Sequence, residues 1–372
     1  MLNCSQLKFH PWQFEWLTSW EVVWDQSLMS RWHEWIDQSA DAHVFFEPSM
    51  VRAWVETYER LKHIEPRFLI ARGGDNCVIF QPLVEVKENW KGAWQTSLRP
   101  VGYSEYDYHD PIIVGQADPL LIKSYWESLF SEIDSRWNRS LDVVAINGLR
   151  SYCISDKFNI NRTGVAPFIS LQGINSVEGF LSSLSQSLRG DIRRQKRRLE
   201  SQGDVTLRVF SKDETEEALN ILPGILSRHA LRWPKSYRAP GFHANIVKNC
   251  LRKGILHMSE LRVNDNPISW HFGFLYKSRY YWYMPVHNPA FNQYSPGKIH
   301  LFMCAGEALK KGVNIFDLLK GEEDYKKQWT TSTEDLFELT WQSTSVISSL
   351  RQIWISGIKP DMSRAAAALK MR

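Results

Sequence analysis

The second half of the chain alternates strand-like and helix-like segments in an order that restricts the folds it can adopt. Strand-like runs lie at 204–210, 255–263, 267–276, 279–286, 314–320 and 336–342, and helix-like stretches lie at 214–232, 242–252, 298–312 and 324–329. Two hairpin-linked strands lead to a third strand, a loop, a helix and a crossover strand. This order predicts an α/β fold, in which a mixed α+β sheet carries helices on its faces.

The first half repeats this order less clearly. Its helix-like stretches lie at 48–61 and 119–137, and its strand-like runs lie at 66–72, 77–86 and 141–149. Because a chain of 372 residues has room for about two domains, we expect two similar domains in tandem. The expected divisions are 1–170, 171–344 and a basic helical tail at 345–372.

Four of the 17 tryptophans recur at every fourth position near the N-terminus, namely Trp12, Trp16, Trp20 and Trp24. This spacing predicts the core-facing side of an amphipathic helix. A platform on which sugars or bases stack is the alternative interpretation.

The formal net charge of +4 is concentrated in two segments. Residues 189–198 contain six basic residues and one acid, and residues 345–372 contain five basic residues and one acid. The five cysteines are far apart and form no CxxC pair, so we expect neither disulfides nor a metal site. With no long apolar run and no secretory signal pattern, the sequence predicts a cytoplasmic location.

The segment Ser295-Pro296-Gly297-Lys298 has the composition of a phosphate-binding helix start. Proline is preorganised for a first turn, serine can cap it, and glycine permits close approach of a ligand. Lysine adds positive charge where the helix dipole already favours anions. The alternative is an ordinary helix start, since Ser-Pro-Gly begins many helices.

A strand that ends at Gly321 leads into a helix that begins with acids. Ligands gather at such strand ends in open α/β sheets. A carboxylate here, Asp317 or Glu323, could accept a proton, and Tyr325 could supply one. Acids in a first turn often serve only to balance the helix dipole.

Several segments then show a resemblance to a known family. The four in the second half are LSQSLRGDIRRQKRRLESQG at 184–203, SRHALRW at 227–233, YSPGKIHLFMCAGEALKKG at 294–312 and IFDLLKGEEDYKKQW at 315–329. With FFEPSMVRAW at 45–54 and YSEYDYHDPIIV at 103–114, they resemble GNAT-fold acyltransferases of the CelD-like, polysaccharide-associated type, which are relatives of the FemAB peptidyltransferases. The resemblance implies two GNAT-like domains in tandem, with the active site on the second.

The resemblance also implies that the donor is acyl-CoA, with acetyl as the expected acyl group, and that no metal takes part. Strand 279–286 would pair with the pantetheine arm, and a backbone N–H near Val286 would stabilise the oxyanion. Residues 295–298 would hold the pyrophosphate, although Gly297 alone represents the glycine-rich loop of ordinary GNAT enzymes. Tyr325 would protonate the leaving thiolate.

Three residues are candidate bases for the attacking amine: Asp317, Glu323 and His271. Structural roles remain open for several of them. Asp317 has a second interpretation as a buried structural acid, His271 as a satisfied core histidine, and Tyr325 as a packed residue at a helix start. Direct transfer needs no covalent intermediate, so no Ser–His or Cys–His pair is expected.

Basic residues provide further candidates for ligand contact. Arg193 and Arg197 share a helical face and could bind phosphates of CoA, of a nucleotide-linked sugar or of a tRNA-borne donor. A solvated helix face is the alternative, and the run lacks the interleaved aromatic residues that base stacking requires. Arg232, Trp233 and Lys326 are candidates for contact with donor or acceptor.

The first half contains an acidic and aromatic loop with Tyr106, Asp107, Tyr108 and Asp110. Its resemblance to the family's loop implies that it binds an amino group of the acceptor, and a polar turn is the alternative. Asp118-Pro119 stands where the second half has Ser295-Pro296. Because an aspartate would repel phosphate there, we expect the first domain to be a degenerate copy without a CoA site.

The expected reaction is direct, acid–base-assisted transfer of an acyl group to a small-molecule amine or amino sugar, as part of a cell-envelope or polysaccharide precursor. One rival is the same fold with aminoacyl-tRNA as donor, and another is a non-catalytic protein that binds RNA or an anionic surface. The tail is expected to dock on the protein's own body. Membrane contact through Ile347, Leu350, Ile353 and Trp354 is the alternative. The oligomeric state stays open.

Overall fold

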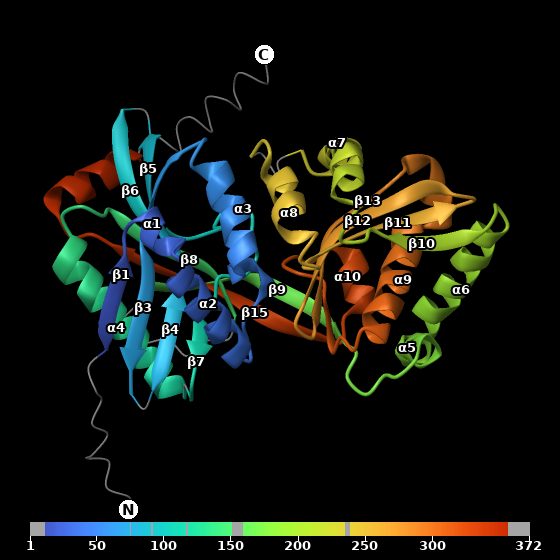
Figure 1. Ribbon diagram of the computed structural model, residues 1–372, viewed down its shortest axis with the longest axis horizontal. Helices are drawn as coiled ribbons and strands as arrows, with labels where there is room; N and C mark the ends of the chain where they lie inside the picture. The colour runs from blue at the N-terminus through green and yellow to red at the C-terminus, as the bar shows by residue number, and fades with distance from the viewer. Residues whose placement is uncertain are drawn as a thin grey trace, which may run out of the picture. The chain divides into compact units, whose positions relative to one another are not determined.

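The computed structural model describes residues 12–355 except 75, 91, 117, 151–158 and 235–238. The chain divides into two units, neither of which is continuous in sequence (Figure 1). Unit 1 consists of Met1–Pro48, Tyr58–Thr163 and Phe337–Arg372, and unit 2 consists of Ser49–Thr57 and Gly164–Leu336. The domain boundaries expected at residues 170 and 344 stay predictions.

Unit 2 is built on a mixed sheet with the strand order β10-β11-β12-β13-β14-β9. The strands are β9 (Asn159–Ser170), β10 (Val205–Val209), β11 (Leu256–Val263), β12 (Asn266–Tyr276), β13 (Arg279–His287) and β14 (Ile315–Asp317). Strands β13 and β14 are parallel, whereas the other neighbours in this order are antiparallel. The predicted mixed α/β fold is therefore confirmed.

Helices cover both faces of this sheet. They are α5 (Val177–Ser183), α6 (Gln186–Glu200), α7 (Thr215–Arg232), α8 (Phe242–Cys250), η2 (Pro289–Tyr294), α9 (Pro296–Lys310) and α10 (Asp324–Trp329). On β12, Phe272 packs against His243 of α8, while its neighbour His271 lies near His300 of α9. Since successive strand residues point to opposite faces, α8 and α9 lie on opposite sides of the sheet.

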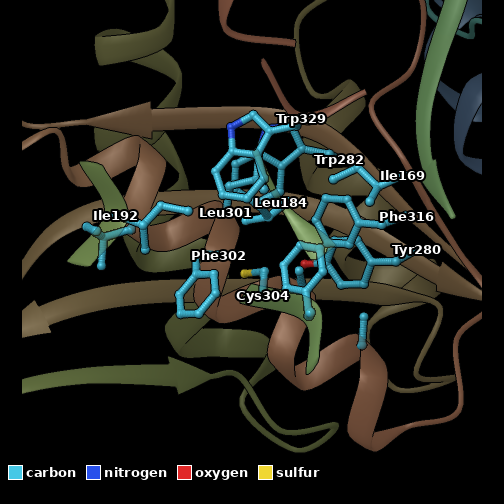
Figure 2. Packing of buried hydrophobic residues seen from close by; sticks show 14 of the residues in the cluster. Ile169, Leu184, Ile192, Tyr280, Trp282, Leu301, Phe302, Cys304, Phe316 and Trp329 are labelled. Carbon is cyan, nitrogen blue, oxygen red and sulfur yellow. The ribbon is translucent and has the colours of Figure 1, made fainter. Parts of the chain in front are cut away.

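The core of unit 2 lies between the sheet and helices α5, α6 and α9 (Figure 2). Helix α6 places Leu188 and Ile192 into this core, because they recur on one face of the helix. Its arginines lie on the solvent side, so the basic run predicted at 189–198 sits on an amphipathic helix anchored by its apolar face. Strand β13 contributes Tyr280 and Trp282 to the same core.

Unit 1 contains a small sheet of order β1-β3-β4-β7 and a second set of strands of order β15-β8-β6-β5-β2. Its strands are β1 (Gln13–Leu17), β2 (His63–Pro66), β3 (Phe68–Gly73), β4 (Cys77–Gln81), β5 (Leu83–Trp90), β6 (Ala93–Pro100), β7 (Ile112–Val114) and β8 (Val143–Arg150). Strand β15 (Ser332–Gln342), like β9, passes from one unit's residues into the other's.

The helices of unit 1 are α1 (Trp20–Val23), α2 (Gln26–Gln38), η1 (Val44–Phe46) and α4 (Pro119–Trp137), and residues 346–355 are also helical. Most of α3 (Pro48–Tyr58) belongs to unit 2. In unit 1, α4 buries Tyr125, Trp126 and Leu129 against the strands. The expected helix at 119–137 is therefore present with the predicted bounds.

Two predictions about unit 1 are wrong in detail. The tryptophan row does not form one helix: Trp16 lies on β1, whereas Trp20 begins the short helix α1. Trp16 contacts Trp137 at a ring distance of 4.4 Å, whereas Trp20 and Trp24 stack on each other at 6.1 Å. The expected strand at 77–86 is two strands, because the chain passes at Pro82 from one sheet to the other, and proline cannot donate to a strand ladder.

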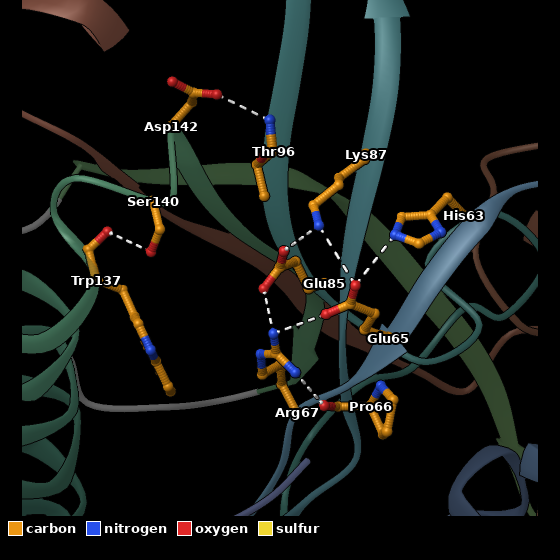
Figure 3. Close-up of polar contacts among 10 residues, drawn as sticks. All are labelled: His63, Glu65, Pro66, Arg67, Glu85, Lys87, Thr96, Trp137, Ser140 and Asp142. Carbon is orange, nitrogen blue, oxygen red and sulfur yellow. Dashed lines mark hydrogen bonds and ion pairs between the residues drawn. The ribbon is translucent and has the colours of Figure 1, made fainter. Parts of the chain in front are cut away.

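The edge strand β2 and its neighbour β5 carry a network of charges (Figure 3). Arg67 lies 2.9 Å from the Glu65 carboxylate and 2.7 Å from the Glu85 carboxylate. Lys87 also pairs with Glu65, at 3.3 Å. Charged side chains on an edge strand discourage pairing with a strand of another molecule.

Candidate active site

Strands β13 and β14 separate shortly after they pair. Their parallel ladder covers three residue pairs, from Arg279 opposite Ile315 to Tyr281 opposite Asp317. On its other side, β13 stays paired with β12 as far as His287. Among the described residues, no strand pairs with the β14 side of β13 beyond Tyr281. This open edge of β13 brings Val286, one of the predicted residues, to the end of the splayed strand.

Helix α9 begins beside the end of this open edge. Its N-cap Ser295 has a left-handed backbone with φ of 50°, and its side chain makes no capping hydrogen bond, contrary to the prediction that it caps the helix. Pro296 is buried at the first helical position. A Cβ atom added to Gly297 would lie 3.8 Å from His287 Nδ1. The first turn of α9 therefore faces His287 and has no side-chain cap.

Lys298 in the first turn of α9 is already paired with an acid. Its ammonium group and the Arg194 guanidinium both contact the carboxylate of Asp191 on α6. Burial raises the pKa of Asp191, but the hydrogen bonds from Lys298 and Arg194 outweigh it and hold that pKa below its usual value. The positive charge at this helix start is thus partly neutralised by Asp191.

A polar pocket of about 500 Å³ adjoins this ion pair. The groups that line it include Ser185, Ser187, Asp191, Arg194, Lys298 and Gln328. Ser185 is the N-cap of α6, three of these residues lie on α6, one lies on α9 and one on α10. The pocket offers hydroxyl, amide and cationic donors, which suit a phosphorylated or polyhydroxylated ligand.

The basic helix α6 lies next to the segment that leads into α9. The Arg198 guanidinium lies 5.6 Å from the ring centre of Tyr294, the last residue of η2. Arg193 and Arg197 are exposed, and Arg197 Nε donates to the Arg193 carbonyl oxygen. Folding thus brings the predicted basic run to the helix start that the sequence proposed for phosphate binding, although the two are about a hundred residues apart.

A second pocket, of about 180 Å³, lies where the end of β13 meets the end of α7. It is lined by Arg232 and Trp233, which the sequence singled out, and by Val286 and His287. The Arg232 guanidinium lies 4.4 Å from the Trp233 ring centre, and Trp233 stacks on His229 at 4.7 Å. Three predicted residues from distant segments therefore share one pocket.

His287 belongs to this pocket but was not predicted as a site residue. Its Nε2 lies 2.8 Å from the Asn292 side-chain oxygen, so Nε2 carries the proton and Nδ1 is left as an acceptor. Burial lowers the pKa of His287, and Arg232 lowers it further, while the bond to Asn292 opposes the shift. A signal was present in the sequence, since a histidine ends the strand just before the loop that leads to Ser295.

Tyr325, the predicted acid, lies partly buried at the start of α10 near three polar groups. Burial raises its pKa, Glu323 adds to the rise, and Arg232 and the Trp282 indole oppose it. The Trp282 N–H is buried and has no partner within hydrogen-bonding geometry among the described residues. The phenol of Tyr325 therefore keeps its proton at neutral pH and lies near the open edge of β13.

Asp317 and Lys326 hold the backbone that follows β14. Asp317 is fully buried, pairs with Arg279 at 2.7 Å, and accepts a hydrogen bond from Leu319 N at 2.8 Å. Lys326 is also buried, and donates to the carbonyl oxygens of Leu319 and Lys320. Leu319 has a φ of 61°, a conformation that bulky residues rarely adopt. Asp317 and Lys326 thus support the backbone between β14 and α10.

Glu323 depends on the glycine that precedes it. Its carboxylate lies 3.0 Å from Lys326 Nζ, and a Cβ atom on Gly321 would collide with both groups. Gly321 also has a φ of 136°, which favours glycine. Glu323 is thus the more exposed member of an ion pair, beside Tyr325.

His271 lies away from both pockets, in a buried network. It has no exposed surface, stacks on Trp282 at 3.7 Å, and its Nδ1 lies 3.1 Å from the hydroxyl of Tyr280. Burial holds its pKa well below the usual value for histidine. This is the core histidine that formed the alternative interpretation, and a group without surface cannot take a proton from a bound amine.

The acidic and aromatic loop of the first half is buried within unit 1. Asp110 pairs with Arg150, whose guanidinium lies 4.7 Å from the ring centre of Tyr108. Tyr106 stacks on Phe45 at 4.9 Å, and Asp107, which lies between Tyr106 and Tyr108 in the sequence, is half-buried. The expectation that Asp110 binds an acceptor amine conflicts with this pairing, because its carboxylate is already neutralised.

No group of three or more His, Cys, Asp or Glu side chains within the described part of the chain is arranged to hold a metal ion. Among the described groups of the site, Tyr325 can give a proton, His287 can take one, and the open edge of β13 can bind an extended chain.

Comparisons with known proteins found a similar domain and a similar fold. No curated protein matches the chain in sequence. Residues 186–327 match the family described as acetyltransferase (GNAT) domain. A solved structure of FemX aligns with a TM-score of 0.61 at 10% identity, over 88% of this chain and 98% of that one. A conserved protein of unknown function from Bacteroides thetaiotaomicron aligns with a TM-score of 0.53 at 13% identity, over 84% and 97% of the two chains.

At such low identity, the two solved structures support the fold alone. The matched family segment begins at α6 and ends in α10, so it contains the open edge of β13, the start of α9 and Tyr325. The CelD-like subtype suggested by the sequence stays a prediction. Residues 186–327 are therefore similar to a GNAT acetyltransferase domain, and they lie within a mixed α/β fold.

Proposed function

We propose that this protein is an N-acyltransferase whose active site lies in unit 2, at the separation of β13 and β14. The open edge of β13 is the observation that carries the proposal. Beyond Tyr281, no strand in the described part of the chain takes the place that β14 occupies before that point. An extended arm with amide groups, such as the pantetheine of acyl-CoA, can take the place of the missing strand.

The start of α9 supports phosphate binding at the end of this edge. The first turn has no side-chain cap, and a helix N-terminus favours anions. Lys298, Arg194 and the exposed arginines of α6 add positive charge around it. Asp191 offsets part of this charge, so a donor phosphate would compete with Asp191 for Lys298.

In the proposed mechanism, the amine attacks the carbonyl carbon of the thioester and its proton passes to Nδ1 of His287. Neutral imidazole is required for this step, and burial beside Arg232 favours it. A backbone N–H of β13 near Val286 stabilises the oxyanion that forms. We prefer His287 over Glu323 as the base, because the Glu323 carboxylate is paired with Lys326.

The collapse of the tetrahedral intermediate breaks the C–S bond. The thiolate then takes a proton from Tyr325, which its raised pKa keeps protonated. The Trp282 N–H, which is buried and lacks a partner within the described chain, provides a donor near this hydroxyl. Asp317 and Lys326 position the loop before α10 through Leu319.

The resemblance to the polysaccharide-associated acyltransferases suggests the acceptor, an amine on a sugar or on another cell-envelope precursor. It also suggests that unit 1 is a second, degenerate GNAT-like domain. The polar pocket beside Asp191 and Lys298 supports an acceptor or donor rich in hydroxyl or phosphate groups.

The test combines binding with product analysis. The full chain is heated with and without CoA and acetyl-CoA, since a ligand at about 100 times its Kd stabilises by about 2.7 kcal/mol. Amino sugars and their nucleotides are then incubated with acetyl-CoA and scanned for acylated products by mass spectrometry. Absence of any thermal shift at millimolar CoA would rule out CoA as the donor.

An aminoacyl-tRNA donor is the second candidate, favoured by one observation. Exposed arginines of α6 lie beside the approach to α9, in positions where a larger polyanion could contact them. Filter binding of tRNA at increasing salt would test it, because each phosphate contact steepens the salt dependence. Arg193→Gln with Arg197→Gln should weaken tRNA binding under this candidate, and leave acetyl-CoA affinity nearly unchanged if CoA is the donor.

A further inference from the structure

The helix at 346–355, drawn in red in Figure 1, docks on unit 1 through its polar side. Ser348 is 1% exposed, and Arg351 Nη1 lies 3.2 Å from the Asp142 carboxylate. Gln352 donates to the Asp142 carbonyl oxygen at 3.3 Å. The helix is held to its unit by hydrogen bonds and an ion pair, which is the reverse of the usual arrangement for a surface helix.

The opposite side of this helix is apolar and exposed. Its large side chains, here called the outer stripe, are Val346, Ile347, Leu350, Ile353 and Trp354, with exposed fractions of 75%, 65%, 62%, 68% and 56%. At about 100° per residue these positions fall within one third of the helix circumference. They are five of the ten large hydrophobic side chains that are exposed in the described part of the chain. Such clustering marks a binding surface.

The charge of the sequence that follows indicates what the outer stripe contacts. Beyond the described residues, the chain continues with Lys359, Arg364, Lys370 and Arg372 against the single acid Asp361. An apolar stripe with a tryptophan, followed at once by a basic segment, matches a surface that is apolar inside and negatively charged outside. An anionic lipid bilayer has this chemistry.

We propose that the outer stripe enters the headgroup region of an anionic membrane and that the basic residues after it contact the lipid phosphates. The contact is interfacial, since none of the described helices is long and apolar enough to cross a bilayer. Trp354 suits the boundary between headgroups and acyl chains, where its apolar ring and polar N–H both find partners. This inference is independent of the donor and acceptor proposed for unit 2.

The size of the stripe argues against a second copy of this chain as the occupant. A ten-residue helix is about 15 Å long and about 10 Å across, so the stripe covers on the order of 150 Å². A stable protein–protein interface buries about 800 Å² on each partner. A membrane needs no such area, because insertion of a few apolar groups adds to the attraction between basic residues and anionic lipid.

The experiment measures sedimentation of the full chain with vesicles of phosphatidylcholine alone and of phosphatidylcholine mixed with phosphatidylglycerol. We expect binding to the mixed vesicles, and about tenfold or greater loss of binding in Leu350→Asp and in Ile347→Asp. Leu120→Asp is the matched control, since Leu120 is an exposed leucine of α4 in the same unit at 56% exposure. That variant should bind vesicles like the wild type.

A second pair of measurements keeps the proposal open to contradiction. Lys359→Glu with Lys370→Glu should reduce binding to the mixed vesicles, and high salt should do the same. Equal binding of wild type and Leu350→Asp, or no binding to either vesicle, would overturn the proposal. So would a concentration-dependent dimer in sedimentation velocity that Leu350→Asp abolishes, because the stripe would then belong to a second copy.

Discussion

Helices α4 and α9 both begin with proline at the first position. A side chain caps the N–H groups of α4, whereas no side chain caps those of α9. In unit 1, Asp118 caps α4, and its carboxylate accepts a hydrogen bond from Leu121 N at 2.8 Å. In unit 2, Ser295 precedes Pro296 with a left-handed backbone and provides no side-chain cap to α9. One helix start satisfies itself with a negative charge, and the other is left available to an external anion.

We propose that the two units share a similar arrangement and that only unit 2 keeps a ligand site. An aspartate cap stabilises a helix by about 1 kcal/mol, and it also fills the position that a phosphate would take. The same contrast extends to the acids of the two units. Asp110 of unit 1 forms a buried ion pair with Arg150, whereas the Glu323 side chain of unit 2 remains partly exposed beside Tyr325. The following predictions test whether this contrast is functional.

The largest effect is expected from Asp110→Asn in unit 1, because it leaves the buried Arg150 charge without its partner. We expect the free energy of unfolding to fall by about 3–5 kcal/mol, measured by urea denaturation of the full chain. Affinity for donor and acceptor per folded molecule should stay the same. A loss of acceptor binding with normal stability would instead return this loop to the active site.

Tyr325→Phe in unit 2 should lower turnover by about 100- to 1,000-fold, because the leaving thiolate loses its proton donor. The variant keeps the ring and its packing, so donor affinity should change little. Turnover is measured by product formation and affinity by calorimetry. Equal losses in both would mean that Tyr325 is only a packing residue.

His287→Gln should lower turnover by about 100-fold and remove the acidic limb of the pH profile. A base must be unprotonated, and the pKa of His287 is lowered from its ordinary value of 6.5. Wild-type kcat/KM should therefore fall only as the pH drops below 6.5. Glu323→Gln is the matched comparison: if that variant loses the limb and His287→Gln keeps it, Glu323 is the base.

The smallest effect comes from exchanging the two helix starts. Ser295→Asp should weaken donor binding about tenfold, since a carboxylate at the start of α9 repels phosphate. Aspartate tolerates the left-handed backbone at this position. Asp118→Ser in α4 is the control and should leave donor affinity unchanged. If Ser295→Asp binds CoA as tightly as the wild type, the phosphates lie elsewhere.

The sequence predicted the second half of the fold better than the first, for a physical reason. In unit 2, hairpins and helices follow one another with short turns, so hydrophobic periodicity marks nearly every element; α7, for example, occupies 215–232 where 214–232 was expected. In unit 1, β6 lies in a segment where no element was expected, because Trp94 and its neighbours lack strict alternation. Strand β9 was also missed.

The site could be predicted only in part, because its members meet through tertiary structure. Arg232, Trp233 and Val286 were chosen for separate reasons and line one pocket. His271 and Asp317 do not line this pocket, because both are fully buried. Burial cannot be read from the identity of a single residue in the sequence. Asn292 shows the remaining limit: its hydrogen bond to His287 crosses a loop, and the sequence offers only the position of that histidine at the end of a strand.

Because unit 2 is not continuous in sequence, its parts are synthesised at different times. Helix α3 supplies Ser49–Thr57 to this unit, and Thr57 accepts a hydrogen bond from Asn245 of α8, which lies 188 residues later in the chain. At a synthesis rate of about 5–20 residues per second, the ribosome makes Asn245 about 10–40 s after Thr57. The same delay applies to the hydrogen bond from Asn249 to Glu56 and to the one from Lys253 to Ser49. Unit 2 therefore cannot be complete until both halves of the chain have left the ribosome, and a fragment that starts at residue 164 would lack one of its helices.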